Sequence, residues 1–198
     1  MRLKPKLPNA VNSQDPEKIA ITKLDAVRRQ LETSVILWFH DGDPVSIHTL
    51  VSAAYQIVYD IHQKRGGVPM KRDLHNVQPG YVKEFRRQLA QYENFFKHAD
   101  KDPLQTVFFP PEITRLFLVD TIEKYHELAN EQRPLLRLFI YYMVFIEPQM
   151  FEANFAKRFH DEIATVVASG VSRREFFHQF LPVLTKIESA ACQPIETD

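Results

Sequence analysis

The sequence has little glycine and almost no cysteine. Its 198 residues include five glycines and one cysteine, Cys192. Phosphate-binding loops and nucleophile elbows need closely spaced glycines, and neither G-x-x-x-x-G-K-[ST], G-x-G-x-x-G nor G-x-S-x-G occurs. A single cysteine excludes an intrachain disulfide, which favours a reducing compartment. We therefore expect a cytoplasmic protein that lacks the common catalytic motifs.

A long hydrophobic run and a predominant charge are also missing. The most apolar stretch, Leu135 to Ile146, contains Arg137 and is shorter than the roughly 20 residues that cross a bilayer, so we expect no membrane association. Basic and acidic side chains number 25 each, which gives no overall attraction to nucleic acid. Residues 64–101 nevertheless carry nine basic and four acidic side chains. This excess either pairs with acidic side chains elsewhere in the fold or forms a basic patch.

Thirteen prolines are present instead, and most stand where an amphipathic helix would begin. Proline is tolerated in the first turn of a helix because its missing N–H group would be unpaired there. Apolar residues between the prolines recur at helical spacing. We predict an all-α protein, a helical bundle of six or seven helices with a buried central helix at about residues 134–146. The predicted helices cover about residues 15–40, 44–65, 79–99, 110–130, 134–146, 148–170 and 172–189.

The chain length indicates a single domain, because no long linker divides the helical pattern. We assign residues 15–189 to this domain and expect flexible tails at residues 1–14 and 190–198. Hydrophobic residues make up 44% of the sequence and include fifteen phenylalanines, which is enough to build a substantial core.

Several aromatic residues stand near predicted helix ends, namely Trp38, Phe39, Phe108 and Phe109. If these rings are not buried, they favour self-association or binding of a protein partner. Burial within the same chain is the alternative for each of them. We expect a homodimer on this basis.

Two Glu-x-x-His pairs, Glu123 with His126 and Glu175 with His178, have the spacing by which helical bundles bind two iron ions. Such a site needs both pairs to point into the bundle. In the last predicted helix, Glu175 and His178 project from the side opposite the apolar face. Ser172 and Glu175 also have the form of a capping box. We therefore expect no metal site and no cofactor, and keep a bundle-core metal-dependent oxidase as an alternative function.

A polar stripe runs along the predicted helix at residues 79–99, opposite its apolar face. Cations, an amide and an imidazole in one line can contact phosphate, and an imidazole can act as general base in a 2′-hydroxyl attack. His98 is the candidate base and the one candidate catalytic residue. The alternative is an ordinary solvated helix face. The candidate binding residues are Lys83, Arg87, Asn94, Lys97 and His98.

The run from Glu93 to His98 is similar to the R-N-x-x-x-H signature of HEPN domains. Asn94 stands at the asparagine of that signature and His98 at its histidine, while Glu93 occupies the arginine position. HEPN domains are helical bundles, frequently dimeric, and many are metal-independent ribonucleases. The resemblance implies an RNA-binding or ribonuclease-type protein that acts through Asn94 and His98, with an anion where the family has a cation.

Longer stretches resemble a group of short, uncharacterised, all-helical bacterial proteins. The similarity lies in Lys23 to Gly67 and in the string NFFKHADKDP at residues 94–103. It implies a soluble helical protein and no known activity. Together with the missing catalytic motifs, this favours a binding or interaction protein without strong catalytic activity, whose partner is a second copy or another protein. An RNA-acting protein is the alternative.

Overall fold

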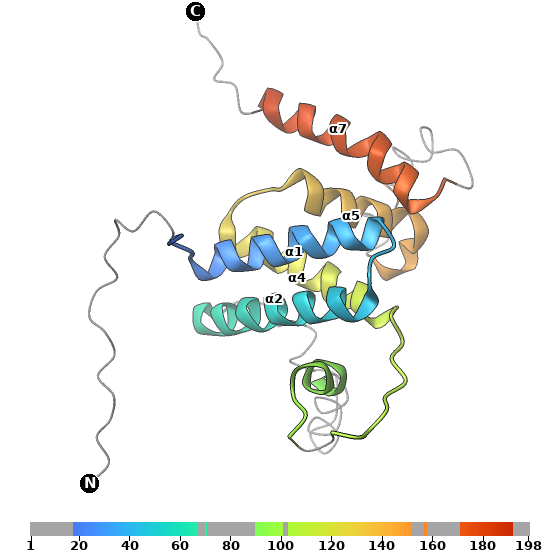
Figure 1. The fold of residues 1–198 in the computed structure, drawn as a ribbon. Coiled ribbons are helices and arrows are strands. Elements are labelled where there is room, and N and C mark those ends of the chain that lie inside the picture. Colours follow the sequence, from blue (N-terminus) through green and yellow to red (C-terminus); the bar gives the residue numbers. More distant parts are fainter. Residues whose placement is uncertain are drawn as a thin grey trace, which may run out of the picture.

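The computed structural model describes residues 18–66, 70, 90–100, 103–151, 157 and 171–191, which form an all-α fold (Figure 1). No strand occurs within these ranges, so the predicted fold class is confirmed. The elements are α1 (Lys23–Phe39), α2 (Pro44–Arg65), α4 (Ile113–Ala129), α5 (Pro134–Ile146), the 3-10 helix η2 (Pro148–Met150) and α7 (Arg173–Ala191). Residues 90–97 form a further helical stretch. The predicted tails lie outside the described ranges, apart from the end of α7.

The first helix begins later than the sequence predicts. Residues 18–22 are not helical, so the predicted start at residue 15 is wrong over this part. Thr22 Oγ1 accepts a hydrogen bond from the Asp25 N–H, and the Asp25 carboxylate accepts one from the Thr22 N–H, both at 3.1 Å. This capping box satisfies two backbone donors that have no partner inside the helix, and its hydrogen bonds lower the pKa of Asp25. Apolar spacing continues upstream of Thr22, but the cap decides where the helix starts.

A tight turn joins α1 to α2, and the two helices lie side by side as an antiparallel pair (Figure 1). The Gly42 N–H donates to the Leu37 carbonyl at 2.7 Å. A Cβ atom at Gly42 would lie 2.9 Å from that oxygen, so the turn needs glycine here. Asp43 then caps α2, because its Oδ1 accepts from the Ser46 N–H at 2.7 Å.

At two later prolines the predicted long helix does not begin at the proline. Helix α4 starts at Ile113, three residues after the predicted position, and ends at Ala129, followed by Asn130, whose backbone is left-handed with φ 50°. Pro148 opens only the 3-10 turn η2, which ends at Phe151 in extended backbone, so the predicted long helix from residue 148 is wrong at its start. The rest of that predicted helix lies outside the described ranges, apart from helical residue 157.

Helix α7 begins directly after Ser172 and contains Pro182. The Ser172 N–H donates to the Glu175 carboxylate at 2.9 Å, so the predicted capping box is confirmed. The helix continues past Pro182 to Ala191, slightly beyond the predicted end at residue 189. None of the helices in the described ranges combines the length and apolar character of a membrane span.

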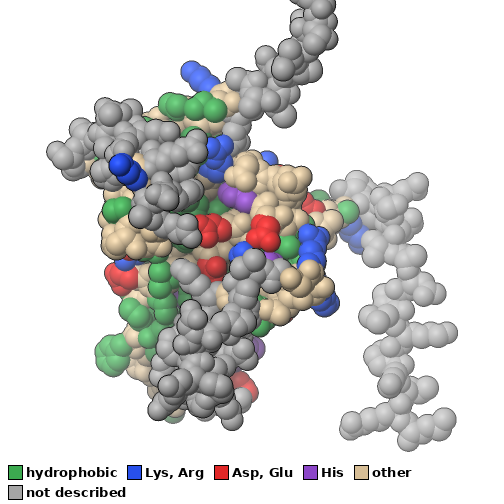
Figure 2. All heavy atoms as spheres, turned by 180° about the vertical axis from the view of Figure 1, so that it is seen from behind, with side chains coloured by type: hydrophobic (Ala, Val, Ile, Leu, Met, Phe, Trp, Pro, Cys, Tyr) green, Lys and Arg blue, Asp and Glu red, His purple; other side chains and the backbone are tan. Residues whose placement is uncertain are grey.

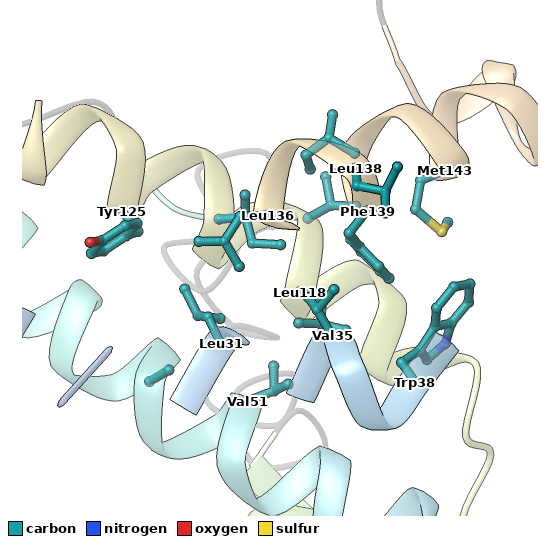
Figure 3. Close-up of a cluster of buried hydrophobic side chains, with 14 of the residues drawn as sticks. Leu31, Val35, Trp38, Val51, Leu118, Tyr125, Leu136, Leu138, Phe139 and Met143 are labelled. Atoms are coloured by element: carbon teal, nitrogen blue, oxygen red, sulfur yellow. The ribbon is translucent and has the colours of Figure 1, made fainter. Parts of the chain in front are cut away.

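The core lies where α1 packs against α2, α4, α5 and α7. Figure 3 shows side chains from α1, α2, α4 and α5 converging there. The predicted buried helix at residues 134–146 is confirmed as α5, although α1 shares the central position. Burial of one such large side chain contributes about 1.5–3 kcal/mol to folding. The buried residues of α5 are Leu136, Leu138, Phe139, Ile140, Tyr142, Met143 and Val144.

An aromatic cluster forms one end of this core. We name it the Trp38 cluster, consisting of Trp38, Phe39, Phe139, Tyr142 and Phe176. Its rings meet edge to face, with the Trp38 centroid 5.1 Å from Phe39 and 5.0 Å from Phe139. Trp38 and Phe39 are therefore buried in their own chain, so these two rings are not available for self-association.

Arg173 covers the outer side of the Trp38 cluster and connects α7 to the end of α1 through two contacts. Its guanidinium lies 5.0 Å from the centre of the Trp38 ring. The same group forms an ion pair with Asp41, in the turn that follows α1. A cation over an indole face is attracted by the ring electrons, so this contact adds to the packing of α7.

Candidate functional site

The predicted polar stripe is described only in part. Lys83 and Arg87 lie outside the described ranges, whereas Asn94, Lys97 and His98 are exposed at the end of the helical stretch. The His98 backbone N–H donates to the Asn94 carbonyl at 3.0 Å, so these residues lie one helical turn apart. The structure thus places the candidate base and the candidate amide on a solvent-exposed side of one helix.

Glu93, at the arginine position of the HEPN signature, forms an ion pair with Lys97. The Lys97 Nζ lies 2.8 Å from Glu93 Oε1, four residues earlier on the helix. Pairs at this spacing stabilise a helix slightly and partly neutralise both charges. The Lys97 cation predicted for phosphate contact is therefore engaged within its own helix.

The two Glu-x-x-His pairs lie on separate helices, α4 and α7. Glu123, Glu175 and His178 are exposed and His126 is half-buried. The Glu175 carboxylate caps α7 through the Ser172 N–H and hydroxyl, at 2.9 and 2.7 Å. Among the residues that the structure describes, no group of three or more His, Cys, Asp and Glu side chains could hold a metal ion.

The opposite side of the helical stretch 90–97 packs around a buried histidine that no sequence motif indicates. His48, on α2, is 1% exposed, and its Nδ1 lies 2.9 Å from Oγ1 of Thr114 in the first turn of α4. Aromatic rings from α4, from the helical stretch and from the segment between them enclose the imidazole. We name this set the His48 cluster. Its ring centroids lie 5.0 Å (Phe109), 5.8 Å (Phe117), 5.9 Å (Phe96) and 6.3 Å (Tyr92) from that of His48.

Burial sets the charge state of His48. Loss of hydration lowers the pKa of its imidazole to about 4, with a smaller opposing effect from Glu93 and a further lowering by Lys97. The ring is therefore neutral at pH 7. Its Nε2 is buried and has no hydrogen-bond partner in the described part of the chain. A buried polar atom without a partner costs free energy, so the His48 cluster is weaker than an all-apolar cluster of the same size.

The His48 cluster holds the segment that leads into α4. Residues 105–110 are not helical and run along one edge of the molecule (Figure 1). The Phe109 ring enters the cluster, with its centroid 5.1 Å from that of Tyr92. The Tyr92 hydroxyl donates to the Phe108 carbonyl at 3.3 Å. Two consecutive residues are thus fixed, one through its ring and the other through its backbone.

The same segment carries the two most exposed large hydrophobic side chains of the described ranges. Leu104 is 96% and Phe108 91% exposed. Figure 2 shows hydrophobic side chains along this edge, at the left of the view. From Thr106 to Pro110 exposed and half-buried residues alternate, which is the period of an extended strand, whereas Pro103 and Leu104 form a turn. The exposed ones are Thr106, Phe108 and Pro110, and the half-buried ones are Val107 and Phe109.

We name residues 104–109 the Leu104–Phe109 segment. The sequence identified Phe108 and Phe109 as aromatic residues that favour association if unburied, and the structure separates them. Phe109 is half-buried in the His48 cluster, whereas Phe108 stays exposed. Of these two rings, only Phe108 is therefore exposed to solvent.

The sequence contains one signal for His48. It lies three residues before Val51 and seven before Tyr55, both buried, so helical periodicity places it on the buried side of α2. Its hydrogen-bond partner Thr114 is 66 residues further along the chain. Periodicity along one helix cannot indicate that contact, which depends on how α4 packs.

Comparison of the chain with family models, with curated proteins and with solved structures finds no match. The resemblance to HEPN domains and to short bacterial proteins therefore has no support from these comparisons. The chain is an all-helical bundle without a family assignment.

Proposed function

We propose that the protein is a binding protein without strong catalytic activity and that the Leu104–Phe109 segment is its binding element. One observation carries this proposal. Leu104 and Phe108 are almost fully exposed on a segment whose next residue, Phe109, is anchored in the His48 cluster. The apolar side chains are thus presented at a fixed place, which lowers the entropy cost of binding.

The backbone of the segment favours an extended polypeptide as partner. Within the described ranges, the Phe108 carbonyl has the only hydrogen bond made by the backbone N–H and C=O groups of residues 106–109. Unpaired groups of this kind bind an added strand through main-chain hydrogen bonds, while alternate side chains give specificity. The segment is rich in residues that favour strands and carries no charge.

Many charged side chains of the helices have structural partners, which also supports a binding role. Arginines at helix ends pair with acidic residues of neighbouring elements, and three carboxylates cap helices with a lowered pKa caused by their hydrogen bonds. The pairs are Arg115–Glu147, Arg133–Glu32 and Arg173–Asp41, and the capping residues are Asp25, Asp43 and Glu175. These charged groups therefore stabilise the fold.

A peptide selection tests the proposed function. A random nonapeptide library is panned against the wild-type chain and counter-selected against Phe108→Ser, which removes the exposed ring and leaves Phe109 in place. We expect enriched peptides in which apolar and polar residues alternate. Their binding, measured by fluorescence anisotropy, should weaken about tenfold or more in Phe108→Ser.

Val183→Ser is the matched control, because Val183 is also an exposed hydrophobic residue but lies on α7. Peptide binding should be unchanged in this variant. Failure to select any peptide whose binding depends on Phe108 would contradict the proposed function.

An RNA-acting role is the second candidate, favoured by the exposed positions of Asn94 and His98 one turn apart. It predicts that the wild-type chain binds or cleaves single-stranded RNA at low salt and that His98→Ala diminishes this activity. His178→Ala is the control, because it removes an exposed imidazole from α7, and it should keep the activity. If the wild type neither binds nor cleaves RNA, this candidate is wrong.

A further inference from the structure

We infer that the His48 cluster is an acid-sensitive switch, in which protonation of His48 releases the Leu104–Phe109 segment and the helical stretch 90–97 while the long helices stay packed. We name this segment and this stretch together the peripheral region. The release itself does not require the proposed function, whereas any effect on peptide binding rests on that function. The switch depends on the central place of His48 among the contacts, on its unpaired Nε2 atom and on the charges around the ring.

His48 joins the peripheral region to the long helices. Among the described residues, every aromatic ring contact between the peripheral region and α2 or α4 is made with the imidazole of His48. The rings concerned are those of Tyr92, Phe96 and Phe109. Phe117 of α4 packs against the same imidazole. A change in the charge of His48 therefore acts on all of these contacts at once.

A protonated His48 has no acceptor for its second N–H group in the closed cluster. Nδ1 is paired with Oγ1 of Thr114 at 2.9 Å, whereas Nε2 is buried without a partner in the described ranges. In the imidazolium ion both ring nitrogens carry a proton and both are donors. The neutral ring leaves one polar atom unpaired, but the protonated ring leaves a charged donor unpaired, which costs more free energy. Opening of the cluster gives this donor to water.

The charged groups around His48 do not compensate for a proton on the ring. Glu93 raises the pKa of the imidazole and Lys97 lowers it, and these two side chains are paired with each other at 2.8 Å. The Leu104–Phe109 segment contains no ionisable residue. The other groups packed against the ring are uncharged at neutral pH and are Tyr92, Phe96, Phe109, Thr114 and Phe117. The described surroundings therefore supply no net negative charge to stabilise an imidazolium ion.

Acid consequently favours the open form. Burial holds the pKa of His48 at about 4 in the closed cluster, against 6.5 for an exposed imidazole. Between these values the open form binds a proton that the closed form does not, so the equilibrium constant for opening rises as the pH falls. From pH 7 to pH 5 this rise is about 20-fold. The Trp38 cluster contains no histidine and is not exposed to this effect.

The position of the peripheral region lets it open separately from the core. Helix α1 packs against α2, α4, α5 and α7. The helical stretch 90–97 contacts α2 through Phe96 and lies on the side of α2 away from α1 (Figure 1). Regions at the edge of a fold open at a lower free energy than the core, so release of this stretch leaves the packing around α1 in place.

Hydrogen exchange of the full chain at pH 7 and pH 5, followed by NMR, tests the switch. Each rate is corrected for the intrinsic effect of pH, so that the protection factor reports the opening equilibrium. Residues 90–98 are the reporter and include the His98 N–H, which donates to the Asn94 carbonyl. In the wild type their protection factors should fall about 20-fold from pH 7 to pH 5. At both pH values they should lie well below those of α5.

Two variants that cannot be protonated at residue 48 test whether His48 is the cause. In His48→Phe and in His48→Leu, the protection factors of residues 90–98 should stay within about twofold between the two pH values. His126→Phe is the matched control, because it replaces another histidine whose pKa is lowered to about 4, by burial and by Arg137. This control should show the wild-type fall. Circular dichroism establishes that each variant keeps its helices.

Three results would overturn the switch. The first is a fall in protection in both His48 variants that equals the fall in the wild type. The second is equal protection of residues 90–98 and α5, which would mean that the region opens only when the whole chain unfolds. The third needs no variant and is a His48 imidazole that titrates near pH 6.5 in the folded wild type, measured by NMR.

The peptide selection distinguishes the switch from the proposed function. Acid-sensitive opening in a chain for which no Phe108-dependent peptide can be selected supports the switch and contradicts the proposed function. Phe108-dependent peptides without acid-sensitive opening leave the proposed function intact and overturn the switch. Absence of both results contradicts both statements.

Discussion

The Trp38 cluster and the His48 cluster are both groups of edge-to-face aromatic rings, but they differ in what lies at their centre. The Trp38 cluster joins α1, α5 and α7 through rings that are all buried. The His48 cluster joins α2, α4 and the segment before α4 around an imidazole whose Nε2 has no partner in the described ranges. In the described ranges, no side-chain polar atom of the first cluster is buried without a hydrogen-bond partner, whereas the second cluster contains such an atom, His48 Nε2.

The two clusters therefore have different roles, since the Trp38 cluster stabilises the helical core and the His48 cluster holds a peripheral segment in place. Apolar ring packing without a polar defect contributes most to folding, so the Trp38 cluster fixes the arrangement of the long helices. The His48 cluster holds a peripheral segment with less free energy, because its histidine loses hydration and regains only one hydrogen bond. The segment is therefore held at the periphery, outside the central core.

The largest effect should come from the Trp38 cluster. Phe39 is fully buried, and Phe39→Ala should lower the free energy of unfolding by about 3–5 kcal/mol because it leaves a cavity between α1 and α5. Urea denaturation followed by circular dichroism measures this change. Ile36→Ala, on the exposed side of the same helix, is the control and should cost far less. Equal costs for the two variants would show that burial in the Trp38 cluster adds nothing to stability.

Acid should act through the His48 cluster. The pKa of the His48 imidazole is near 6.5 when unfolded and about 4 when folded, so between these values the unfolded chain binds a proton that the folded chain does not. This contribution to stability is complete above the unfolded pKa and is lost as the pH falls from about 6.5 to about 4. His48→Phe should therefore lose about 2 kcal/mol less than the wild type between pH 7 and pH 5.

Chemical denaturation at several pH values measures this difference. His126 provides a comparison, because burial and the Arg137 charge lower its pKa to about 4 as well. His126→Phe should remove its own share of the acid sensitivity and leave that of His48. If the free energy of unfolding falls equally with pH in the wild type and in His48→Phe, folding does not lower the pKa of His48.

The smallest effect concerns the outer side of the Trp38 cluster. Arg173→Met keeps the apolar stem over Trp38 but removes the cation and the ion pair with Asp41. We expect a loss of about 0.5–1 kcal/mol that shrinks in high salt, since the pair is exposed. Arg174→Met, at the exposed neighbouring position, should have no measurable effect. A loss of several kcal/mol in Arg173→Met would show that the Trp38 cluster also depends on a charge.

The helices themselves follow closely from local sequence. Asp43 with Pro44, and Ser172 with Glu175, mark helix starts that the structure confirms, because an N-cap is a contact between residues at most a few positions apart. Local sequence was less reliable where two signals competed. Thr22 caps α1 although apolar spacing continues before it, and Pro148 opens a single 3-10 turn, so the predicted helix does not start there.

The candidate site was harder to predict for a physical reason. Asn94 and His98 form a motif in the sequence, and the structure places them on an exposed helix side. His48 and Thr114 belong to no motif, and their contact spans 66 residues. A buried histidine is recognisable only when the elements that bury it are in place.

The sequence by itself determined an all-helical chain with an apolar helix at residues 134–146, since caps, prolines and helical periodicity act between residues a few positions apart. Tertiary packing alone decided which aromatic rings are hidden. Trp38 and Phe39 lie in the core, Phe109 lies against His48, and Phe108 stays in solvent. Neighbouring residues differ in this way because burial depends on which distant helix reaches each side of the chain.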